Sequence, residues 1–448
     1  MANEVPIHSQ GVYSDPAILE GKGVMLFDRN TGDGVPFDAS KLATVAKDLS
    51  MFTLDGASLV LRETANSYVV RTAGTYKIPL VYGNGIKNGV ANTAAYTSLG
   101  GAYQSDFVNH LGNKITSPYI EKNANCQPSS AALLWQTAQG MISSVSLVEG
   151  GDCKYIQFTV ATVPSTNGDA LLVVKDPSGR IMWSWLIWCT SDALSAEEFT
   201  NSTSVRYNLM SENLGAIWNT ARTRYYNPHW QWGRPTPGAP VTGGGSQATL
   251  YDINGNTYSG WGVRGSDLDA LATKTVAEAI QNPHLFFTRY DSVSNSWNNL
   301  AWFNNFWNAA LNSSSSLADD QASAIKTIYD PCPVGFMMPS GRAFTGFTST
   351  GSNSEDATTF NVIGSFANGW TFKRNAADAV GNYFPASGFR LSASGGLNNV
   401  GSYGNYWSYA SNSQAYARNL YFDSGGIYPL NSNNRAYGFS VRPCREFN

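Results

Sequence analysis

Charged side chains are scarce in this chain. Asp, Glu, Lys and Arg together make up 14% of its 448 residues, whereas an average soluble domain has about 25%. The net charge at pH 7 is only −3, so the chain has no basic field that would attract a phosphate backbone. The sequence therefore predicts that no nucleic acid is among the protein's partners.

Histidine and cysteine are also few. The 4 histidines are scattered, and the 5 cysteines do not show the CxxC or Cys/His spacing of a metal site. We therefore expect no metal centre built on these residues and no histidine-based catalytic triad. An odd number of cysteines also argues against a secreted fold that depends on disulfides.

Long apolar runs are absent. No stretch approaches the roughly 18 apolar residues of a membrane span, so no membrane insertion is expected. The first residues, MANEVP, have neither the basic nor the apolar region of a secretory signal peptide. Either a signal has been removed from the chain, or the protein is made in a cytoplasm and leaves by another route, as a virion component released by lysis does.

Aromatic and small polar residues dominate what is present. Aromatics reach 13%, glycine numbers 43, and Asn, Ser and Thr are plentiful. This balance is typical of β-rich proteins whose loops carry neutral hydrogen-bonding groups. The chain exceeds the ~250–300 residues at which a single core stops growing, so two or three domains are expected.

Short β-type runs separated by Gly, Asn and Pro fill residues 57–192, which predicts a β-sandwich. The predicted strands are 58–62, 67–70, 77–82, 155–160, 171–174 and 181–188. Residues 1–56 show little periodicity beyond a short helix over 38–49, and we interpret them as an attachment or leader segment.

The Ser/Thr/Asn-rich stretch 193–205 is interpreted as a linker on composition alone. Residues 206–448 form the predicted second domain. Its loop signals surround two helix candidates, one from Ser266 towards Ile280 and one from Ser316 onwards. The predicted fold class is therefore mainly β with some α.

Three motifs in the first predicted domain resemble a known family. They are TAGTYKIPLVYGNGIKNG at 72–89, FVNHLG at 107–112 and WSWLIW at 183–188. Together they resemble the β-sandwich of fimbrillin-like surface proteins from gut anaerobes. The resemblance implies a fimbrillin-like, immunoglobulin-like sandwich over 57–192.

Five blocks of the second domain resemble another family. They are NLGAIW at 213–218, WQWGR at 230–234, YDINGN at 251–256, YDPCPVGFMMPS at 329–340 and GFSVRPC at 438–444. Their order and spacing resemble the FISUMP-type major paralogous domain, which is similar to formylglycine-generating-enzyme-like and C-type-lectin-like folds. The resemblance implies a C-type-lectin-like α+β domain over 206–448.

The end of this domain is similar to the variable region of proteins diversified by diversity-generating retroelements, here over about 385–443. In such proteins, mutated template adenines turn Asn codons into Asn, Tyr, Ser, Asp, Gly and similar codons at scattered positions. The resemblance implies that side chains of this kind form an exposed ligand-binding face. Those implied are Tyr403, Asn405, Asn412, Ser413, Tyr416, Arg418, Tyr421, Asp423, Gly426, Tyr428, Asn431, Asn433 and Tyr437.

The same residue types suit a binding surface on physical grounds. Tyr gives a large contact area at low entropic cost, and Ser, Gly and Asn supply adaptable hydrogen bonds. Between 402 and 437 only Arg418, Asp423 and Arg435 are charged, so recognition would rest on shape and hydrogen bonding. A carbohydrate fits such a face, because rings stack on sugar CH groups while amides bond hydroxyls. A protein ligand is equally compatible, since Tyr and Trp also dominate protein hot spots.

The alternative interpretation treats the aromatics as strand core and the Asn and Gly residues as turns. Alternation along the chain favours core positions for one set: Trp407, Leu420, Phe422, Phe439 and Val441. It favours exposure for another: Tyr416, Tyr421, Tyr428 and Tyr437. The pair Asn433–Asn434 is compatible with either a turn or the binding face.

The cysteines allow two hypothetical bridges. Cys332 and Cys444 lie in two of the family-like blocks and could meet as the chain closes on itself, and Cys126 could pair with Cys153. Cys189 is expected to be a small buried apolar residue. In a reducing cytoplasm both pairs would remain thiols.

An enzyme is not expected. Cys332 is flanked by prolines with no base or metal partner nearby in the sequence. Asp252, Asp267 and Asp269 could supply a glycosidase pair, but turns and a helix N-terminus explain them better. Residues 251–256 faintly resemble a calcium loop without the later bidentate Glu. We expect no catalytic residue, no cofactor and no obligatory metal, and a structural calcium ion stays open.

These observations favour a receptor-binding protein of the phage tail-fibre type, located in the virion. Its partners would be a host cell-surface glycan or protein and other virion proteins. It would be a homo-oligomer, commonly a trimer, in which avidity multiplies weak contacts. The alternative is a bacterial cell-surface or fimbrial tip adhesin, with pilus proteins as partners.

Overall fold

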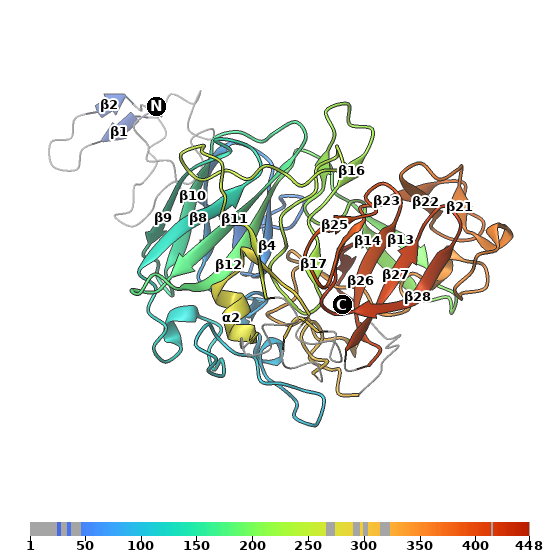
Figure 1. Ribbon diagram of the computed structural model, residues 1–448. Helices are drawn as coiled ribbons and strands as arrows, with labels where there is room; N and C mark the ends of the chain where they lie inside the picture. Colours follow the sequence, from blue (N-terminus) through green and yellow to red (C-terminus); the bar gives the residue numbers. More distant parts are fainter. Residues whose placement is uncertain are drawn as a thin grey trace.

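The computed structural model describes residues 25–27, 34–36, 46–265, 274–289, 296–298, 303–313, 323–413 and 415–447. Figure 1 shows long strands from the N-terminal half beside a group of smaller sheets from the C-terminal half. Strand β1 (Met25–Phe27) pairs with β2 (Gly34–Pro36) as an antiparallel hairpin. The predicted fold class, mainly β with some α, is confirmed.

Two four-stranded sheets make up the N-terminal half, in the orders β3-β5-β10-β9 and β4-β12-β11-β8. Their strands are β3 (Lys47–Asp48), β4 (Ser67–Val70), β5 (Gly74–Pro79), β8 (Ser130–Gln136), β9 (Ile142–Val148), β10 (Tyr155–Val160), β11 (Gly168–Lys175) and β12 (Ile181–Cys189). Buried side chains of both sheets belong to one hydrophobic core. The arrangement is that of a β-sandwich, and five of the six predicted strands overlap its strands.

The predicted strand 58–62 is wrong. Ser58 makes one isolated bridge to Phe52, and the side chains of Val60 and Leu61 are 94% and 52% exposed. High β-propensity does not make a strand without a neighbour that completes the hydrogen-bond ladder.

Strand β12 ties the two halves together. All nine of its residues are buried, because its sheet is covered on both faces. Ser184 Oγ lies 2.9 Å from Thr236 Oγ1, and Trp188 Nε1 donates to the carbonyl of Ala216. The main hydrophobic core therefore continues from the sandwich into the C-terminal half.

Backbone carbonyls of a C-terminal block also bond to the sandwich. Asn66 Nδ2 donates to the carbonyls of Ile328 (2.7 Å) and Asp330 (2.8 Å), and Ser67 Oγ donates to that of Pro331. Both Asn66 and Ser67 are buried, so these bonds are shielded from water. The YDPCPVG block thus docks the two halves onto each other.

Residues 193–205 do not form the expected linker. They contain β13 (Ala196–Thr200), which pairs antiparallel with β14 (Arg206–Met210). The same sheet continues through β30 (Cys444–Arg445) to β20 (Phe336–Met337). Because Phe199 is buried in a second hydrophobic core, this segment is part of the folded body.

The C-terminal half otherwise consists of small sheets. One has the order β17-β29-β24-β25, one β21-β22-β23 and one β26-β27-β28, and two two-stranded sheets, β15-β16 and β18-β19, accompany them in the described residues. A further two-stranded sheet, β6-β7, belongs to the N-terminal half. The remaining strands are β6 (Ile86–Lys87), β7 (Val90–Ala91), β15 (Ile217–Trp218), β16 (Tyr225–Tyr226), β17 (Trp230–Gln231), β18 (Gly262–Arg264), β19 (Leu285–Phe287), β21 (Val362–Ile363), β22 (Gly369–Lys373), β23 (Gly381–Pro385), β24 (Phe389–Arg390), β25 (Leu397–Asn398) and β29 (Gly438–Phe439).

Helix is sparse. The α-helix α2 (Val276–Gln281) starts where Thr275 Oγ1 accepts a hydrogen bond from Glu278 N. It overlaps the end of the predicted helix 266–280, of which residues 266–273 lie outside the described residues. The predicted helix start at Ser316 also lies outside them. Of the predicted helix 38–49, the described part is β3 and the start of a 3₁₀ turn, Leu49–Met51. Within the described residues, no helix is long and apolar enough to cross a membrane.

All five cysteines are buried thiols, so neither predicted bridge is present. Cys126 accepts a hydrogen bond from Asn109 Nδ2 at 3.3 Å. Cys332 belongs to the main core, whereas Cys444 belongs to the second core. The expectation for Cys189, a fully buried small side chain, is confirmed.

Candidate functional site

Three antiparallel strands near the C-terminus form the sheet on which the candidate site is built. They are β26 (Gly404–Ser411), β27 (Tyr416–Phe422) and β28 (Ile427–Asn434). Because side chains alternate across a strand, each strand presents one set of residues to each face. Register pairs Asn405 with Tyr421 and Tyr421 with Tyr428, which places these three on one face.

The opposite face of this sheet packs on the second hydrophobic core. Tyr406, Leu420, Phe422 and Ile427 are fully buried there. The predicted framework is confirmed, since all five of its members are at most 2% exposed: Trp407, Leu420, Phe422, Phe439 and Val441.

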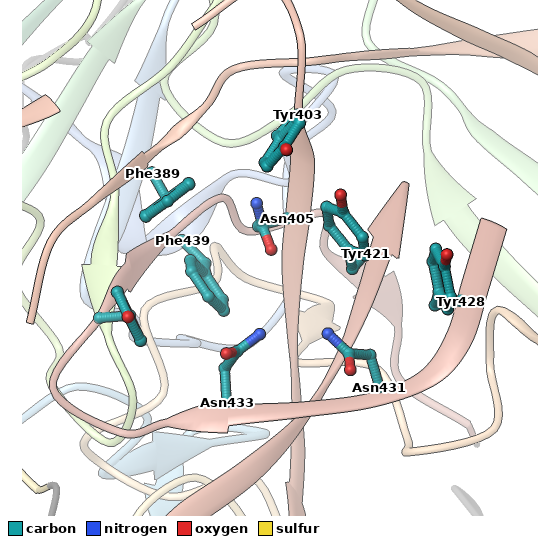
Figure 2. A pocket seen from close by; sticks show the side chains of 9 residues that line it. Phe389, Tyr403, Asn405, Tyr421, Tyr428, Asn431, Asn433 and Phe439 are labelled. Atoms are coloured by element: carbon teal, nitrogen blue, oxygen red, sulfur yellow. The ribbon is translucent and has the colours of Figure 1, made fainter. Parts of the chain in front are cut away.

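A hollow of about 440 Å³ opens over the first face. Its lining residues are Phe389, Tyr403, Asn405, Tyr421, Tyr428, Asn431, Asn433, Tyr437 and Phe439 (Figure 2). Seven of the thirteen residues predicted to bind ligand line it. We call this hollow the aromatic pocket.

A β-bulge in β28 brings more side chains to the pocket than simple alternation would. Tyr428 pairs with Tyr421 and Asn431 pairs with Asn419, so the register shifts between them. Tyr428 and Asn431 are three residues apart, and the extra residue lets both lie on the same face. Asn433 follows two residues later on that face.

The walls of the pocket are a connected series of aromatic rings. Tyr421 stacks on Tyr428, with centroids 5.1 Å apart and planes at 26°, and meets Tyr403 edge-on at 5.3 Å. On the other side Tyr437 stacks on Phe439 at 5.6 Å, and both rings meet Phe389 nearly at right angles. Rings that contact one another in this way hold each other in place.

Amide side chains form the polar part of the lining. Asn419 Nδ2 lies 3.5 Å from Asn405 Oδ1, and Asn433 Nδ2 lies 3.4 Å from Asn419 Oδ1, so long contacts link three strands. The side-chain amide of Asn431 also belongs to the lining. Figure 2 shows Asn405 between the aromatic walls and Asn431 and Asn433 along one edge. These amides can donate to and accept from a ligand.

Two tyrosine hydroxyls of the pocket donate to carboxylates just outside it. Tyr421 Oη donates to Asp423 Oδ2, and Tyr428 Oη donates to Glu355 Oε1 at 2.7 Å. Burial, followed by the bond to Asp423, raises the pKa of Tyr421 well above its usual value. The bond to Glu355 is the largest cause that raises the pKa of Tyr428 to about 12. Both phenols are therefore neutral at physiological pH.

Four predicted ligand residues lie away from the pocket. Tyr416 begins β27 and is 37% exposed. Asn412 Nδ2 donates to Ser432 Oγ, and the neighbouring Ser413 carbonyl accepts from the buried Arg435. Arg418 lies on the face opposite to Asn419 and donates to the carbonyl of Leu430 at 3.1 Å.

Two further predicted residues support the pocket without lining it. Asp423 holds the Tyr421 hydroxyl, as described above. Gly426 leaves room for Tyr428, because a Cβ at this glycine would lie 2.4 Å from the Tyr428 ring. The pair Asn433–Asn434 lies within β28, so the turn interpretation is wrong for it.

Sequence reasoning missed Phe389 and Glu355. Phe389 lies in β24, which joins the pocket through β29, and Glu355 is 73 residues before the tyrosine that it binds. Nothing local in the sequence connects either residue to the sheet. Phe439 was predicted only as framework, yet it is both buried and part of the pocket wall.

The residues weighed for catalysis or calcium are engaged otherwise or lie outside the described residues. Asp252 Oδ1 accepts from the backbone N–H groups of Asn254 and Asn256, which closes a turn. Asp267 and Asp269 lie outside the described residues. Burial raises the pKa of the Cys332 thiol well above its usual value. The parts of the chain that the structure describes contain no cluster of three or more His, Cys, Asp or Glu side chains placed to hold a metal.

Comparison with known proteins adds one match. A family model described as a domain of unknown function, DUF8237, matches residues 364–444. This segment spans the three strands of the site and every lining residue of the pocket. No curated protein and no solved structure matches the chain.

Proposed function

We propose that this protein is a receptor-binding protein that recognises a cell-surface ligand through the aromatic pocket. The observation that carries the proposal is the convergence of seven residues of binding-surface type on one hollow of about 440 Å³. Framework neighbours on the same strands, such as Leu420 and Phe422, are buried in the core instead, whereas the framework residue Phe439 belongs to both sets. The strands therefore separate a presented set from a structural set.

The pocket has the physical character of a ligand site. Small-molecule sites are concave, about 300–1,000 Å³ in volume, and lined by aromatic rings with a few polar groups. Here the rings pack on one another and on buried neighbours, such as Trp407 against Phe439 at 4.2 Å. A ligand would meet a surface that is already formed, so little ordering entropy is lost on binding.

A glycan is the ligand that this chemistry favours. The flat faces of the tyrosines suit the CH groups of a sugar ring, and the Asn405, Asn431 and Asn433 amides suit its hydroxyls. A monovalent site of this size would be weak, which fits the expected homo-oligomer, commonly a trimer, in which several pockets act together.

Of the two biological settings, we retain the phage tail-fibre type in a virion as the proposal, with a bacterial surface or fimbrial tip adhesin as the alternative. Both settings need a cell-surface receptor and no catalysis. Neighbouring genes for tail proteins, or for pilus proteins, distinguish them.

The test compares two pairs of predicted ligand residues. An Asn431→Ala/Asn433→Ala variant changes the pocket, whereas an Asn412→Ala/Ser413→Ala variant changes the connection between β26 and β27, away from the pocket. Binding of each purified variant to intact bacterial cells and to a glycan array is measured beside the parent chain. We expect the first variant to lose at least tenfold in affinity and the second to bind normally. If both variants bound cells and glycans with the same affinity, the pocket would not be the binding site and the proposal would be wrong.

A further inference from the structure

We propose that the aromatic pocket accepts a neutral sugar ring and excludes the acidic sugar of the same shape. This inference rests on the proposed function and adds the class of ligand. Three features of the described residues carry it: the direction of the tyrosine hydrogen bonds, the carboxylates behind them and the charge of the lining.

The hydroxyl protons of Tyr421 and Tyr428 are already used. Each hydroxyl donates to a carboxylate, Asp423 or Glu355, and a phenol has only one proton to donate. Towards the pocket both oxygens can therefore only accept. A ligand must bring donors to this side, as sugar hydroxyls do, and a ligand carboxylate, phosphate or sulfate has none to offer.

The two carboxylates also give this side of the pocket a negative potential. Asp423 Oδ1 accepts from Gly425 N, and within the described residues neither Asp423 nor Glu355 forms an ion pair with a Lys or Arg. These two carboxylates are bonded to hydroxyls of the pocket wall, so they repel an anionic ligand in the pocket. The repulsion is strongest at low salt, because dissolved ions screen it.

No lining residue is positively charged. The nearby arginines point elsewhere: Arg418 to the opposite face of the sheet, Arg390 to the carbonyls of Ala239 and Gly395, and Arg435 to the carbonyl of Ser413. All three donate to backbone carbonyls. An acidic ligand would therefore find no cation in the lining to compensate the repulsion.

Matched sugar pairs test this directly. Glucose with glucuronate, galactose with galacturonate and mannose with mannuronate differ only in a CH₂OH group replaced by a carboxylate. Binding of each to the full chain is measured by calorimetry at low salt. A variant, Asp423→Asn/Glu355→Gln, keeps an acceptor oxygen for each tyrosine but removes both charges. Asp252→Asn, which removes one charge in a distant turn, is the matched control.

We expect at least one neutral sugar to bind and its acidic counterpart to bind at least about tenfold more weakly, the size expected for two nearby like charges. The gap should close in the Asp423→Asn/Glu355→Gln variant, because the acidic sugars are no longer repelled, and persist in Asp252→Asn. Acidic sugars that bind as well as neutral ones would overturn the inference, as would a gap that survives in the double variant.

A failure of the proposed function looks different. If no sugar of any pair binds, yet Asn431→Ala/Asn433→Ala still abolishes binding to cells, the pocket recognises something other than a sugar and only the inference is wrong. If that variant binds cells normally, the proposed function itself is wrong.

Discussion

Gly426 provides a sharp test of how the pocket is built. It does not line the pocket, but a Cβ on this residue would lie 2.4 Å from Cε2 of Tyr428 and 2.7 Å from its hydroxyl. A Gly426→Ala substitution must therefore move the Tyr428 ring. The neighbouring Gly425 is the matched control, because its Cβ would meet only Asp423 Oδ1, at an ordinary 3.6 Å.

The magnitude follows from the contacts that the ring would lose. Its stacking on Tyr421 contributes about 0.5–1.5 kcal/mol and its hydrogen bond to Glu355 about 0.5–1.5 kcal/mol. The ring is only half-buried and can resettle, so we expect a loss of about 1 kcal/mol in the free energy of unfolding. Binding should suffer more visibly, because one wall of the pocket is displaced: a loss of 1 kcal/mol or more weakens the affinity at least about fivefold.

The assay is cell or sugar binding together with urea unfolding for the parent, Gly425→Ala and Gly426→Ala chains. Gly425→Ala should resemble the parent in both. If Gly426→Ala also keeps the parent's affinity, then the Tyr428 ring is not part of the binding surface and the account of the pocket is wrong.

Three further predictions concern the body that holds the site. Burial and, as a smaller cause, the neighbouring Arg390 lower the pKa of His229 from 6.5 to about 3. Below pH 6.5, His229 therefore binds a proton in the unfolded chain but stays neutral in the folded chain. Because of this residue, the free energy of unfolding should fall by about 2 kcal/mol between pH 7 and pH 5. The difference in unfolding free energy between the parent and His229→Asn should shrink by the same amount over that range. A difference that stays constant with pH would contradict this prediction. Gly404→Ala would place a Cβ 2.1 Å from the buried Phe422 ring and should cost about 1–3 kcal/mol of stability by overpacking, so an unchanged urea midpoint would contradict the described packing. Titration of the denatured chain without reductant should find 5 thiols. A result of three or fewer would show that the chain contains a disulfide.

The separation of framework from presented residues could be predicted from the sequence. Strand β27 alternates between Arg418, Leu420 and Phe422 on one face and Asn419 and Tyr421 on the other, and alternation is a local property of the chain. The strands of the sandwich were predictable from another local property, short apolar runs between turn signals. The run IMWSWLIWC is apolar except for Ser184, as expected of a strand buried on both faces.

What failed depended on partners distant in the chain. The stretch 193–205 has the composition of a linker, but β14 and, through it, the C-terminal β30 make it a strand of a sheet. The run 58–62 has the composition of a strand but no neighbour to complete it. In the site, the bulge at Pro429 and Leu430 sets which residues of β28 face the pocket, and alternation alone cannot predict a bulge.

Tyr421 and Tyr416 offer the most direct measurement of the central claim. Both lie on β27 and both were predicted from sequence to bind ligand, but Tyr421 is in the pocket wall and Tyr416 is exposed outside it. Dissociation constants for receptor-bearing cells are measured for Tyr421→Ala and Tyr416→Ala, with folding checked by unfolding curves. We expect at least a tenfold loss of affinity for Tyr421→Ala and a change of less than about twofold for Tyr416→Ala, since a central aromatic truncation costs ~2 kcal/mol or more. Equal losses would mean that the whole sheet surface binds, and a loss confined to Tyr416→Ala would place the site outside the pocket.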